Sequence, residues 1–429
     1  MKHVLIFTYY WTPAGGVAVQ RWLKFSKYLP ENGWQPVIVT VKDGSYPYTD
    51  SSLEKEVLPS IKVYKTDTFE PFELYNLLRG KKGKQLPTAM LDSSKKKSLF
   101  QKAAEYIRAN FFIPDARKGW VKYAVSTGAS IIKNQKIDAI ITTGPPHSTH
   151  LIGLILKKEF GVKWIADFRD PWTSIFTNHY LPRASWAKKY DKSLEDKVLK
   201  AADTVAVIGP SMKQEFEDRA KRIAVIWNGF DETDSNEITA KTNNVIFTIR
   251  YVGNLFASQK IPAFWKAVAR LAKEENAKLQ IEFIGRVDES VKLLIEENNL
   301  QNLVRYKDFV PHTEAIQLIF TADALLFAIP QVPNDERIIT GKIFEYLAAV
   351  KPILAFGNTN GDAAKLLQEC GREAMCDFED EATAFNTLSQ FYLAFKHREE
   401  ISYNNAFQVF SRSNQAKKMA NVLSEITTA

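Results

Sequence analysis

The stretch ITGKIFEYLAAVKPILAFG, residues 339–357, holds a short predicted helix and, directly after it, a short apolar predicted strand. The helix covers 341–349 and carries Lys342 and Glu345 three residues apart. A helix that leads straight into a buried strand at 352–356 is typical of α/β units, in which crossover helices connect parallel strands. Lys342 and Glu345 could form an ordinary i,i+3 surface pair, worth about 0.2–0.5 kcal/mol, or they could serve a ligand.

The same alternation of strand-like and helix-like segments extends from this stretch toward both ends of the chain. Strands are predicted at 3–8, 36–41, 137–142, 162–167, 204–208, 223–227, 246–253, 279–284, 303–307, 324–328 and 352–356. Helices are predicted at 16–29, 147–160, 184–201, 211–219, 261–273, 289–298, 313–320, 341–349, 362–369 and about 405–426, with a helix-rich stretch at 100–134. This alternation predicts two doubly wound α/β domains in tandem, each with a parallel sheet.

The alternation pauses at DETDSNEITAKTNN, residues 231–244, which has almost no apolar content. Such a polar segment is typical of a linker between domains. We therefore predict a first domain at 1–230, a second at 245–402 and a C-terminal helical segment at 403–429. A long polar and basic insertion, at about 43–98, interrupts the first domain.

The composition suits a protein with sizeable cores. The 429 residues are 45% hydrophobic and 12% aromatic, which fits two or three domains. The two cysteines, Cys370 and Cys376, are too few for a disulfide framework and lack histidines at zinc spacing, so a reducing cytoplasm is expected. No window reaches the roughly 18 apolar residues of a membrane span, and we interpret the N-terminal apolar run as a first strand rather than a signal peptide.

The net charge of +8 is unevenly distributed along the chain. Residues 1–230 contain 36 Lys and Arg against 22 Asp and Glu, whereas residues 231–429 contain 21 against 27. Basic runs occur at 79–84, at 95–97 and at the pairs 157–158 and 188–189. Each run could be a solvated face, but a cationic half suits an anionic membrane surface or an acidic ligand. Nucleic acid is not expected as a partner, because no nucleic-acid-binding motif accompanies the charge.

Residues that follow the predicted strands are the candidates for a site, since ligands bind beyond the carboxyl ends of parallel strands. Gly15 and Gly16 follow the first strand at a helix start, where the backbone can approach an anionic ligand. An ordinary tight turn is the alternative. The spacing is not G-x-G-x-x-G, which argues against a dinucleotide-dependent oxidoreductase.

Two further strand ends of the first domain carry polar groups. His147 stands at a helix start after the strand at 137–142, as a ligand-facing residue or as a helix cap. The motif ADFRDPW, at 166–172, places four candidates on the rim of a cleft: Asp167, Arg169, Asp170 and Trp172. The alternative for this motif is an internal Arg–Asp pair that holds the loop.

Seven short motifs occur in order along nearly the whole chain. They are Gly15-Gly16, PPH at 145–147, ADFRDPW at 166–172, IWNGFD at 226–231, YVGNL at 251–255, FIGRV at 283–287 and TGKIFEYLAAVKPIL at 340–354. Each motif is weak alone, but their order and spacing together resemble the glycosyltransferases of the GT-B fold, specifically the family 4-type retaining enzymes of bacterial surface-glycan assembly. The resemblance implies two Rossmann-like domains that face each other across a cleft, with the C-terminal helix crossing back to the N-terminal domain.

The resemblance also implies that the C-terminal domain binds a nucleotide-sugar donor of the UDP or GDP type. Glu345 is expected to accept hydrogen bonds from the two ribose hydroxyls. Thr340, Gly341 and Lys342 start the same helix, where free N–H groups, the helix dipole and an ammonium favour the pyrophosphate. Gly15, Gly16 and Gly253 are expected to let the backbone approach the donor.

The chain departs from the family pattern at the first of two glutamates that such enzymes often carry eight residues apart. Arg337 stands eight residues before Glu345, and Glu336 stands one residue further back. Either the loop shifts its register and Glu336 serves near the transferred sugar, or this branch does without that glutamate.

A second departure concerns the basic groups that reach the donor diphosphate in the family. Here Asn254 follows Gly253, and Gln259 stands where the family often has a lysine, with Lys260 beside it. The diphosphate charge is then expected to be met by four basic residues: Lys260, Arg286, Arg337 and Lys342.

The implied reaction moves a sugar from a nucleoside diphosphate to an acceptor hydroxyl with retention of the anomeric configuration. Positive groups and helix N-termini stabilise the leaving diphosphate. The resemblance implies metal independence, and no resident cofactor is expected. His147 is expected near the transferred sugar, and Asp170 or Arg169 is expected to orient the sugar or the acceptor.

The acceptor is expected to meet the N-terminal domain through Arg21, Asp167 and Trp172. A glycan or polyprenyl-linked acceptor, a cytoplasmic location and docking on the inner membrane leaflet through the basic insertion are the corresponding expectations. Two alternatives remain at this point: a nucleotide-sugar epimerase of the same architecture, and a non-catalytic protein that keeps the fold.

Overall fold

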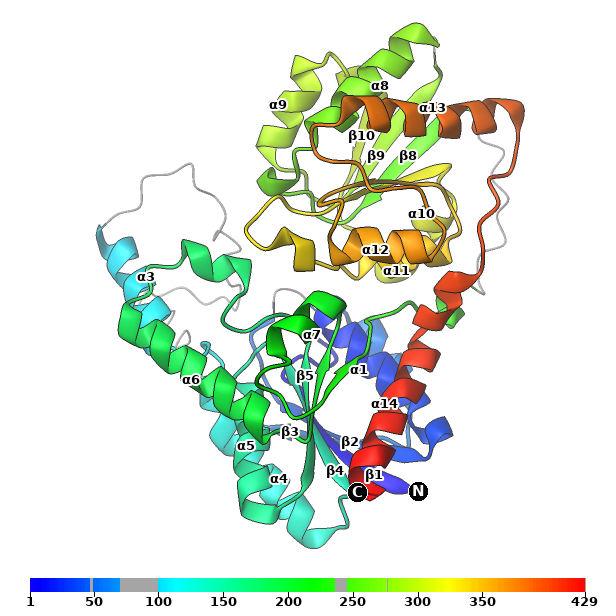
Figure 1. Cartoon of the computed structure of the whole chain (residues 1–429). Coiled ribbons are helices and arrows are strands. Elements are labelled where there is room, and N and C mark those ends of the chain that lie inside the picture. The colour runs from blue at the N-terminus through cyan, green and yellow to red at the C-terminus, as the bar shows by residue number, and fades with distance from the viewer. Residues whose placement is uncertain (47–48, 70–98, 236–244, 276, 429) are drawn as a thin grey trace. The chain divides into compact units, whose positions relative to one another are not determined.

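The computed structural model describes residues 1–46, 49–69, 99–235, 245–275 and 277–428. Contacts divide the chain into two compact units (Figure 1). The first unit consists of Met1–Trp227 and Arg412–Ala429, and the second consists of Asn228–Ser411. Most of the basic insertion, including the runs at 79–84 and 95–97, lies outside the described residues.

A parallel sheet forms the centre of the first unit. Its strands lie in the order β3-β2-β1-β4-β5-β6-β7. Their bounds are β1 Lys2–Phe7, β2 Trp34–Val41, β3 Lys62–Thr66, β4 Ala139–Gly144, β5 Lys163–Phe168, β6 Thr204–Val207 and β7 Ile223–Val225. The order turns back between β1 and β4, which is the doubly wound arrangement.

Both faces of this sheet are buried, because its central strands are apolar at successive positions rather than at alternate ones. In β1, Leu5 and Phe7 enter one core while Val4 and Ile6 enter the other. Helices cover both faces. The helices of this unit are α1 Val17–Tyr28, α3 Leu99–Phe111, α4 Val121–Asn134, α5 Thr149–Phe160, α6 Ser185–Ala201, α7 Pro210–Phe216 and α14 Arg412–Thr428.

The last helix, α14, packs on α1, the first helix of the chain (Figure 1). Its buried residues join the core that contains Val4 and Ile6; they include Met419, Val422, Leu423 and Ile426. The prediction that the C-terminal helix returns to the N-terminal domain is therefore confirmed.

The second unit repeats the architecture with a five-stranded parallel sheet in the order β10-β9-β8-β11-β12. The strands are β8 Phe247–Val252, β9 Leu279–Ile284, β10 Val304–Lys307, β11 Ala324–Ala328 and β12 Ile353–Phe356. The helices are α8 Pro262–Glu274, α9 Glu289–Glu297, α10 His312–Phe320, α11 Lys342–Ala348, α12 Asp362–Glu369 and α13 Glu381–His397. The predicted fold class, two doubly wound parallel-sheet domains of the GT-B type, is confirmed.

Two elements were missed by the sequence analysis. Strand β3 lies within the predicted insertion and pairs with β2 at the edge of the first sheet. Helix α13 packs beside α8 in the second unit (Figure 1). The final helical segment is also split, because residues 406–410 form a 3-10 helix in the second unit and α14 begins only at Arg412. Among the described residues, no helix is both long enough and apolar enough to cross a membrane.

Candidate functional site

Two glycines are in close contact at the carboxyl ends of the neighbouring strands β8 and β9 in the second unit. Gly253 and Gly285 have φ angles of 114° and 118°, in the left-handed region that favours glycine. A Cβ atom on Gly285 would lie 2.8 Å from the carbonyl oxygen of Gly253, and one on Gly253 would lie 2.6 Å from Cε of Lys342. The absence of side chains therefore lets the two strand ends and the start of α11 approach each other closely.

Lys342, the first residue of α11, places its ammonium above the end of β8. Its Nζ donates a hydrogen bond to the Tyr251 hydroxyl at 2.8 Å and lies 4.0 Å from the centre of the Tyr251 ring. No carboxylate of the described ranges forms an ion pair with Lys342. The backbone N–H of Val252 donates to the buried Tyr346 hydroxyl at 3.0 Å, which fastens α11 to β8. An uncompensated cation is thus held rigidly at the strand end.

Gln259, at the position where the family often has a lysine, braces the same strand end. Its side-chain amide donates to the carbonyl of Ala328 at 2.7 Å and to the Tyr251 hydroxyl at 3.3 Å. Its carbonyl accepts the backbone N–H of Phe256 at 3.0 Å. Gln259 is only 4% exposed, so its side chain stabilises the strand end and is not available to a ligand. Lys260, the next residue, is exposed and is the basic group at this position that a ligand can reach.

Glu345 lies one turn along α11 from Lys342, and its carboxylate forms no hydrogen bond or ion pair with any residue that the structure describes. The i,i+3 pair with Lys342, which the sequence left open as an alternative, is not formed. Thr340, just before the helix, has a buried hydroxyl without a hydrogen-bond partner in the described part of the chain. Gly341 caps the helix with a helical φ of −58°.

Three other predicted donor residues, and Glu336, which was predicted near the transferred sugar, lie by this strand end or in the segment before α11. Asn254 is exposed and accepts the backbone N–H of Arg286 at 3.2 Å, so these two residues lie together. Glu336 and Arg337 form an ion pair with each other at 3.1 Å, with side chains 40% and 28% exposed. The Glu336 carboxylate is bound to Arg337 and contacts no sugar in this structure. Its role as the sugar-facing glutamate therefore stays a prediction.

In the first unit, Asp167 at the end of β5 is the centre of a buried polar cluster. Its carboxylate accepts hydrogen bonds from Arg21 at 2.8 and 3.2 Å, from the Trp22 indole at 2.8 Å and from the Thr143 hydroxyl at 2.8 Å. Arg21 is 2% exposed and Asp167 is fully buried. The acceptor-binding role predicted for these two residues does not fit this burial, because the pair instead fastens α1 to the sheet.

Arg169 holds the loop that follows β4. Its guanidinium donates to the carbonyls of Ala18 at 2.7 Å, Pro145 at 2.6 Å and Gly144 at 3.3 Å. Burial lowers the pKa of Arg169, while the carboxylates of Asp167 and Asp170 oppose that change. Arg169 is thus a positioning residue for the loop that carries His147.

The Gly15-Gly16 turn lies just before α1, and Gly16 has a φ of 95°.

His147 lies in a stack of aromatic rings. Its ring is parallel to that of Trp172, with 5.3 Å between centroids and an interplanar angle of 6°. Burial, together with the charge of Arg169, lowers the pKa of His147 to about 3 even though the Pro171 backbone opposes the change, so the imidazole is neutral near pH 7. Trp172 is 2% exposed and donates to Asp191 at 2.8 Å. The acceptor-binding role predicted for Trp172 therefore does not fit; its ring supports His147.

Asp170 is the partly exposed carboxylate of the ADFRDPW motif. It forms no hydrogen bond or ion pair with a described residue. Burial raises the pKa of Asp170 to about 6, although the positive charge of Arg169 lowers it. A carboxylate with this pKa can exchange a proton close to neutral pH.

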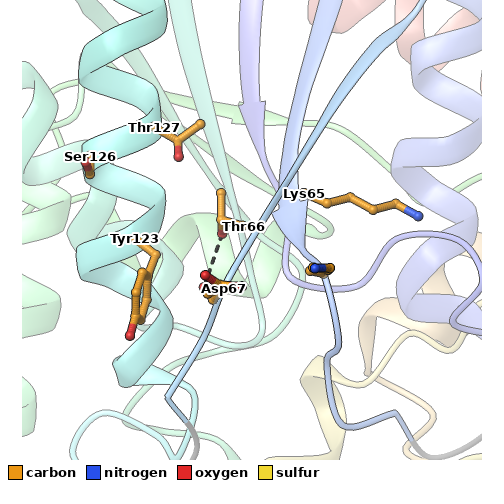
Figure 2. A pocket seen from close by; sticks show the side chains of 7 residues that line it. Lys65, Thr66, Asp67, Tyr123, Ser126 and Thr127 are labelled. Carbon is orange, nitrogen blue, oxygen red and sulfur yellow. Dashed lines mark hydrogen bonds between the residues drawn. The ribbon is translucent and has the colours of Figure 1, made fainter.

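Two cavities of the first unit are lined by none of the predicted site residues. One, of about 420 Å³, lies at the carboxyl ends of β2 and β3 beside α4 (Figure 2). Figure 2 shows Tyr123 and Thr127 of α4 near Thr66 and Asp67, with Lys65 extending away from them. The other, of about 460 Å³, lies between α3 and residues 179–182.

Among the described residues, no group of three or more His, Cys, Asp or Glu is arranged to hold a metal ion. Metal independence nevertheless stays a prediction, since it depends on how the leaving diphosphate is stabilised.

The family model for Glycosyltransferase Family 4 matches residues 93–234, which form about a third of the chain. This match confirms the resemblance to family 4 in the N-terminal part. No curated protein matches the sequence.

Solved structures match over nearly the full length. A glycosyltransferase from Rickettsia africae ESF-5 is 15% identical, with a TM-score of 0.57 and coverage of 99% of this chain and 98% of that chain. The lipopolysaccharide outer core galactosyltransferase WaaB is 14% identical, with a TM-score of 0.57 and 99% coverage of both chains. A mutant of S. aureus TarM, in complex with Fondaparinux, alpha-GlcNAc-glycerol and UDP, is 11% identical, with a TM-score of 0.54 and coverage of 99% and 100%. At these identities the likeness establishes the GT-B fold.

Proposed function

We propose that this chain, a GT-B glycosyltransferase with a family 4 match in its first unit, moves a sugar from a nucleoside-diphosphate sugar to an acceptor hydroxyl with retention of configuration. The bond between the anomeric carbon and the diphosphate oxygen breaks, and its electron pair stays on the diphosphate. The acceptor oxygen forms the new bond to the anomeric carbon. The proton of the acceptor hydroxyl passes to the departing phosphate oxygen, so a separate general base is not required.

The observation that carries the proposal is the pair of Lys342 and Glu345 on α11. Neither charge is compensated by a described residue, although the two lie one helical turn apart beside the carboxyl end of β8. A diphosphate needs a cation and the two adjacent ribose hydroxyls need an acceptor, so one nucleotide would satisfy both groups. Gly253 has no side chain that would displace the Lys342 ammonium from this point.

The remaining donor contacts follow from charge. Lys260 and Arg286 are exposed basic residues near the same strand end, and neither forms an ion pair within the described ranges. With Lys342 they would stabilise the charge that develops on the diphosphate, without a metal ion. UDP is the favoured nucleotide, because TarM was solved with UDP, and GDP is the alternative.

The first unit would supply the groups near the acceptor. Both ring nitrogens of His147 are buried without a hydrogen-bond partner among the described residues, so its neutral imidazole has an N–H to donate only to a sugar hydroxyl that reaches into this loop. The Asp170 carboxylate, which is partly exposed, can orient the acceptor hydroxyl. The acceptor is proposed to be a bacterial surface glycan, or its polyprenyl-linked precursor, at an anionic inner membrane leaflet. The excess of basic residues in 1–230 and the likeness to WaaB support that proposal.

A nucleotide panel tests the function. UDP, GDP, ADP, CDP and dTDP and their common sugars are compared by thermal shift and then incubated with the enzyme. A ligand at 100 times its dissociation constant stabilises the native state by about 2.7 kcal/mol. We expect one nucleotide to raise the melting temperature and its sugar to be transferred only when an acceptor is present. Conversion of the donor alone into an isomer would point to an epimerase instead, and no shift with any nucleotide would contradict the donor site.

Asp170 predicts a pH dependence of the transfer rate. Because the pKa of Asp170 is raised to about 6, the carboxylate is ionised above that pH and protonated below it. Transfer should therefore fall about tenfold per pH unit below 6, since only the ionised form accepts the hydrogen bond of the acceptor. His147 does not contribute to this slope, because it stays neutral throughout.

The variant Asp170→Asn isolates that effect in a pH profile of kcat/KM. We expect it to be slower than wild type at pH 7.5 and to lose the slope between pH 5 and 7. A profile that keeps the same slope in the variant would show that another group titrates.

A further inference from the structure

Helix α3 carries an exposed apolar stripe. Leu99, Ala103, Ile107 and Phe111 follow one another at intervals of four residues, which places them along one side of the helix. Leu99 is 86% exposed, Ile107 is 51% and Phe111 is 57%. Large apolar side chains scattered singly over a surface are ordinary, but a continuous stripe marks a place where something binds.

The beginning of α6 extends this stripe. Trp186 and Tyr190, four residues apart, are each 51% exposed. The rings of Phe111 and Trp186 meet edge to face with 5.7 Å between centroids. Asn110 of α3 donates to the carbonyl of Pro182 at 2.9 Å and accepts the backbone N–H of Ala184 at 2.6 Å. The two helices therefore lie side by side as one rigid face (Figure 1).

Basic residues flank the apolar groups. Lys188 and Lys189 are exposed between Trp186 and Tyr190, and Lys102 is exposed on α3. The first acidic residue of α6, Asp191, is buried and paired with Arg183 at 2.7 Å, so it does not offset the lysines at the surface. Glu105 is the single acid of α3. We define the α3–α6 surface as the following seven residues: Leu99, Ile107, Phe111, Trp186, Lys188, Lys189 and Tyr190.

We propose that the α3–α6 surface docks the protein on an anionic phospholipid bilayer. In a helix that lies at a membrane surface, the side chains of leucine, isoleucine and phenylalanine enter the boundary between the lipid headgroups and the acyl chains. Tryptophan and tyrosine favour the headgroup level, and lysines pair with lipid phosphates. A protein partner is less suited to this face, because lysine is depleted from the centres of protein interfaces. This inference rests on the proposed function in one respect: docking would bring a lipid-linked acceptor within reach of the enzyme.

Co-sedimentation with vesicles tests the docking in the absence of donor and acceptor, so its outcome is independent of transfer. Wild type should bind vesicles with about 30% anionic phospholipid at 0.1 M salt, and raising the salt to 0.5 M should weaken binding through screening. Each lysine near such a surface strengthens binding about fivefold. Lys188→Glu with Lys189→Glu should therefore lower the partition coefficient more than about 25-fold.

The matched control reverses another exposed lysine pair of the same unit, Lys417 and Lys418 on α14. It makes the same change in net charge and should reduce binding far less. Ile107→Ser with Phe111→Ser should lower binding at least about tenfold, because two half-exposed apolar side chains lose their burial in lipid. Leu293→Ser, which removes a 52% exposed leucine from the second unit, should change nothing.

Trp186 gives a direct readout of depth. Of the nine tryptophans, all of which the structure describes, it is the one with an exposed ring. Lipids brominated in the upper acyl chain should quench part of the tryptophan fluorescence in wild type and much less in Trp186→Phe. Equal quenching in both proteins, or equal vesicle binding by the two lysine-pair variants, would overturn the proposal. Self-association that the Ile107/Phe111 variant abolishes, without vesicle binding by wild type, would instead assign the face to a second copy.

Discussion

Replacing Glu345 by alanine is expected to weaken binding of the donor nucleotide about 150- to 25,000-fold while leaving the fold intact. Hydrogen bonds to a charged group contribute about 1.5–3 kcal/mol each, so loss of the two ribose contacts would remove about 3 to 6 kcal/mol. The fold should be unaffected, because no described residue contacts that carboxylate by a hydrogen bond or ion pair. Isothermal titration with the nucleotide that the panel identifies measures the change.

A 2′-deoxynucleotide shows whether the loss concerns the ribose. The penalty of Glu345→Ala should shrink when the 2′-hydroxyl is absent, since the two changes remove the same contact. Glu297→Ala, an exposed glutamate of α9 in the same unit, is the matched control and should bind as wild type does. An unchanged dissociation constant in Glu345→Ala would contradict both the ribose contact and the donor site proposed at α11.

Replacing Asp167 by alanine is expected to lower the free energy of unfolding of the first unit by about 3 to 5 kcal/mol. The substitution leaves the guanidinium of Arg21 buried without its counter-charge and takes the acceptor away from Trp22 and Thr143. Urea unfolding followed by tryptophan fluorescence reports this unit, because eight of the nine tryptophans belong to it and only Trp265 lies in the second.

Two further variants show that the loss comes from an uncompensated buried charge. Asp218→Ala removes a 75% exposed carboxylate 3.4 Å from Arg219 and should cost less than about 1 kcal/mol. The double variant Arg21→Met with Asp167→Leu should recover part of the stability, because both charges are then gone. If Asp167→Ala unfolded at the same urea concentration as wild type, the pair would not be the anchor of α1.

The fold could be predicted because parallel strands that are buried on both faces have continuous apolar sequences. All eleven predicted strands coincide with observed ones. The missed strand, β3, is a short edge strand of sequence KVYKT, in which two lysines face solvent as they do on many sheet edges. Helix α13 had a readable pattern, since Ala384, Leu388, Phe391 and Tyr392 recur at helical spacing and are buried.

The candidate site was predictable where one local motif carries it and not where distant segments meet. Lys342 and Glu345 share a helix, so their proximity follows from spacing alone. Arg21 and Asp167 are 146 residues apart, and nothing in either segment indicates that they pair. Gln259 and Trp172 were likewise given ligand-related positions from the motif order, whereas their partners Ala328 and Asp191 lie on other elements.

Helix α14 makes the first unit depend on residues that are translated after the whole of 228–411. Met1–Trp227 leaves the ribosome early, yet the helix that covers α1 begins only at Arg412. At about 5–20 residues per second, translation of the intervening 228–411 takes roughly 10 to 40 s. During that interval the apolar face of α1 that α14 later covers stays exposed to solvent, so chaperones are expected to bind the nascent chain. A stop codon before residue 412 would therefore destabilise the first unit, although most of that unit is translated before residue 228.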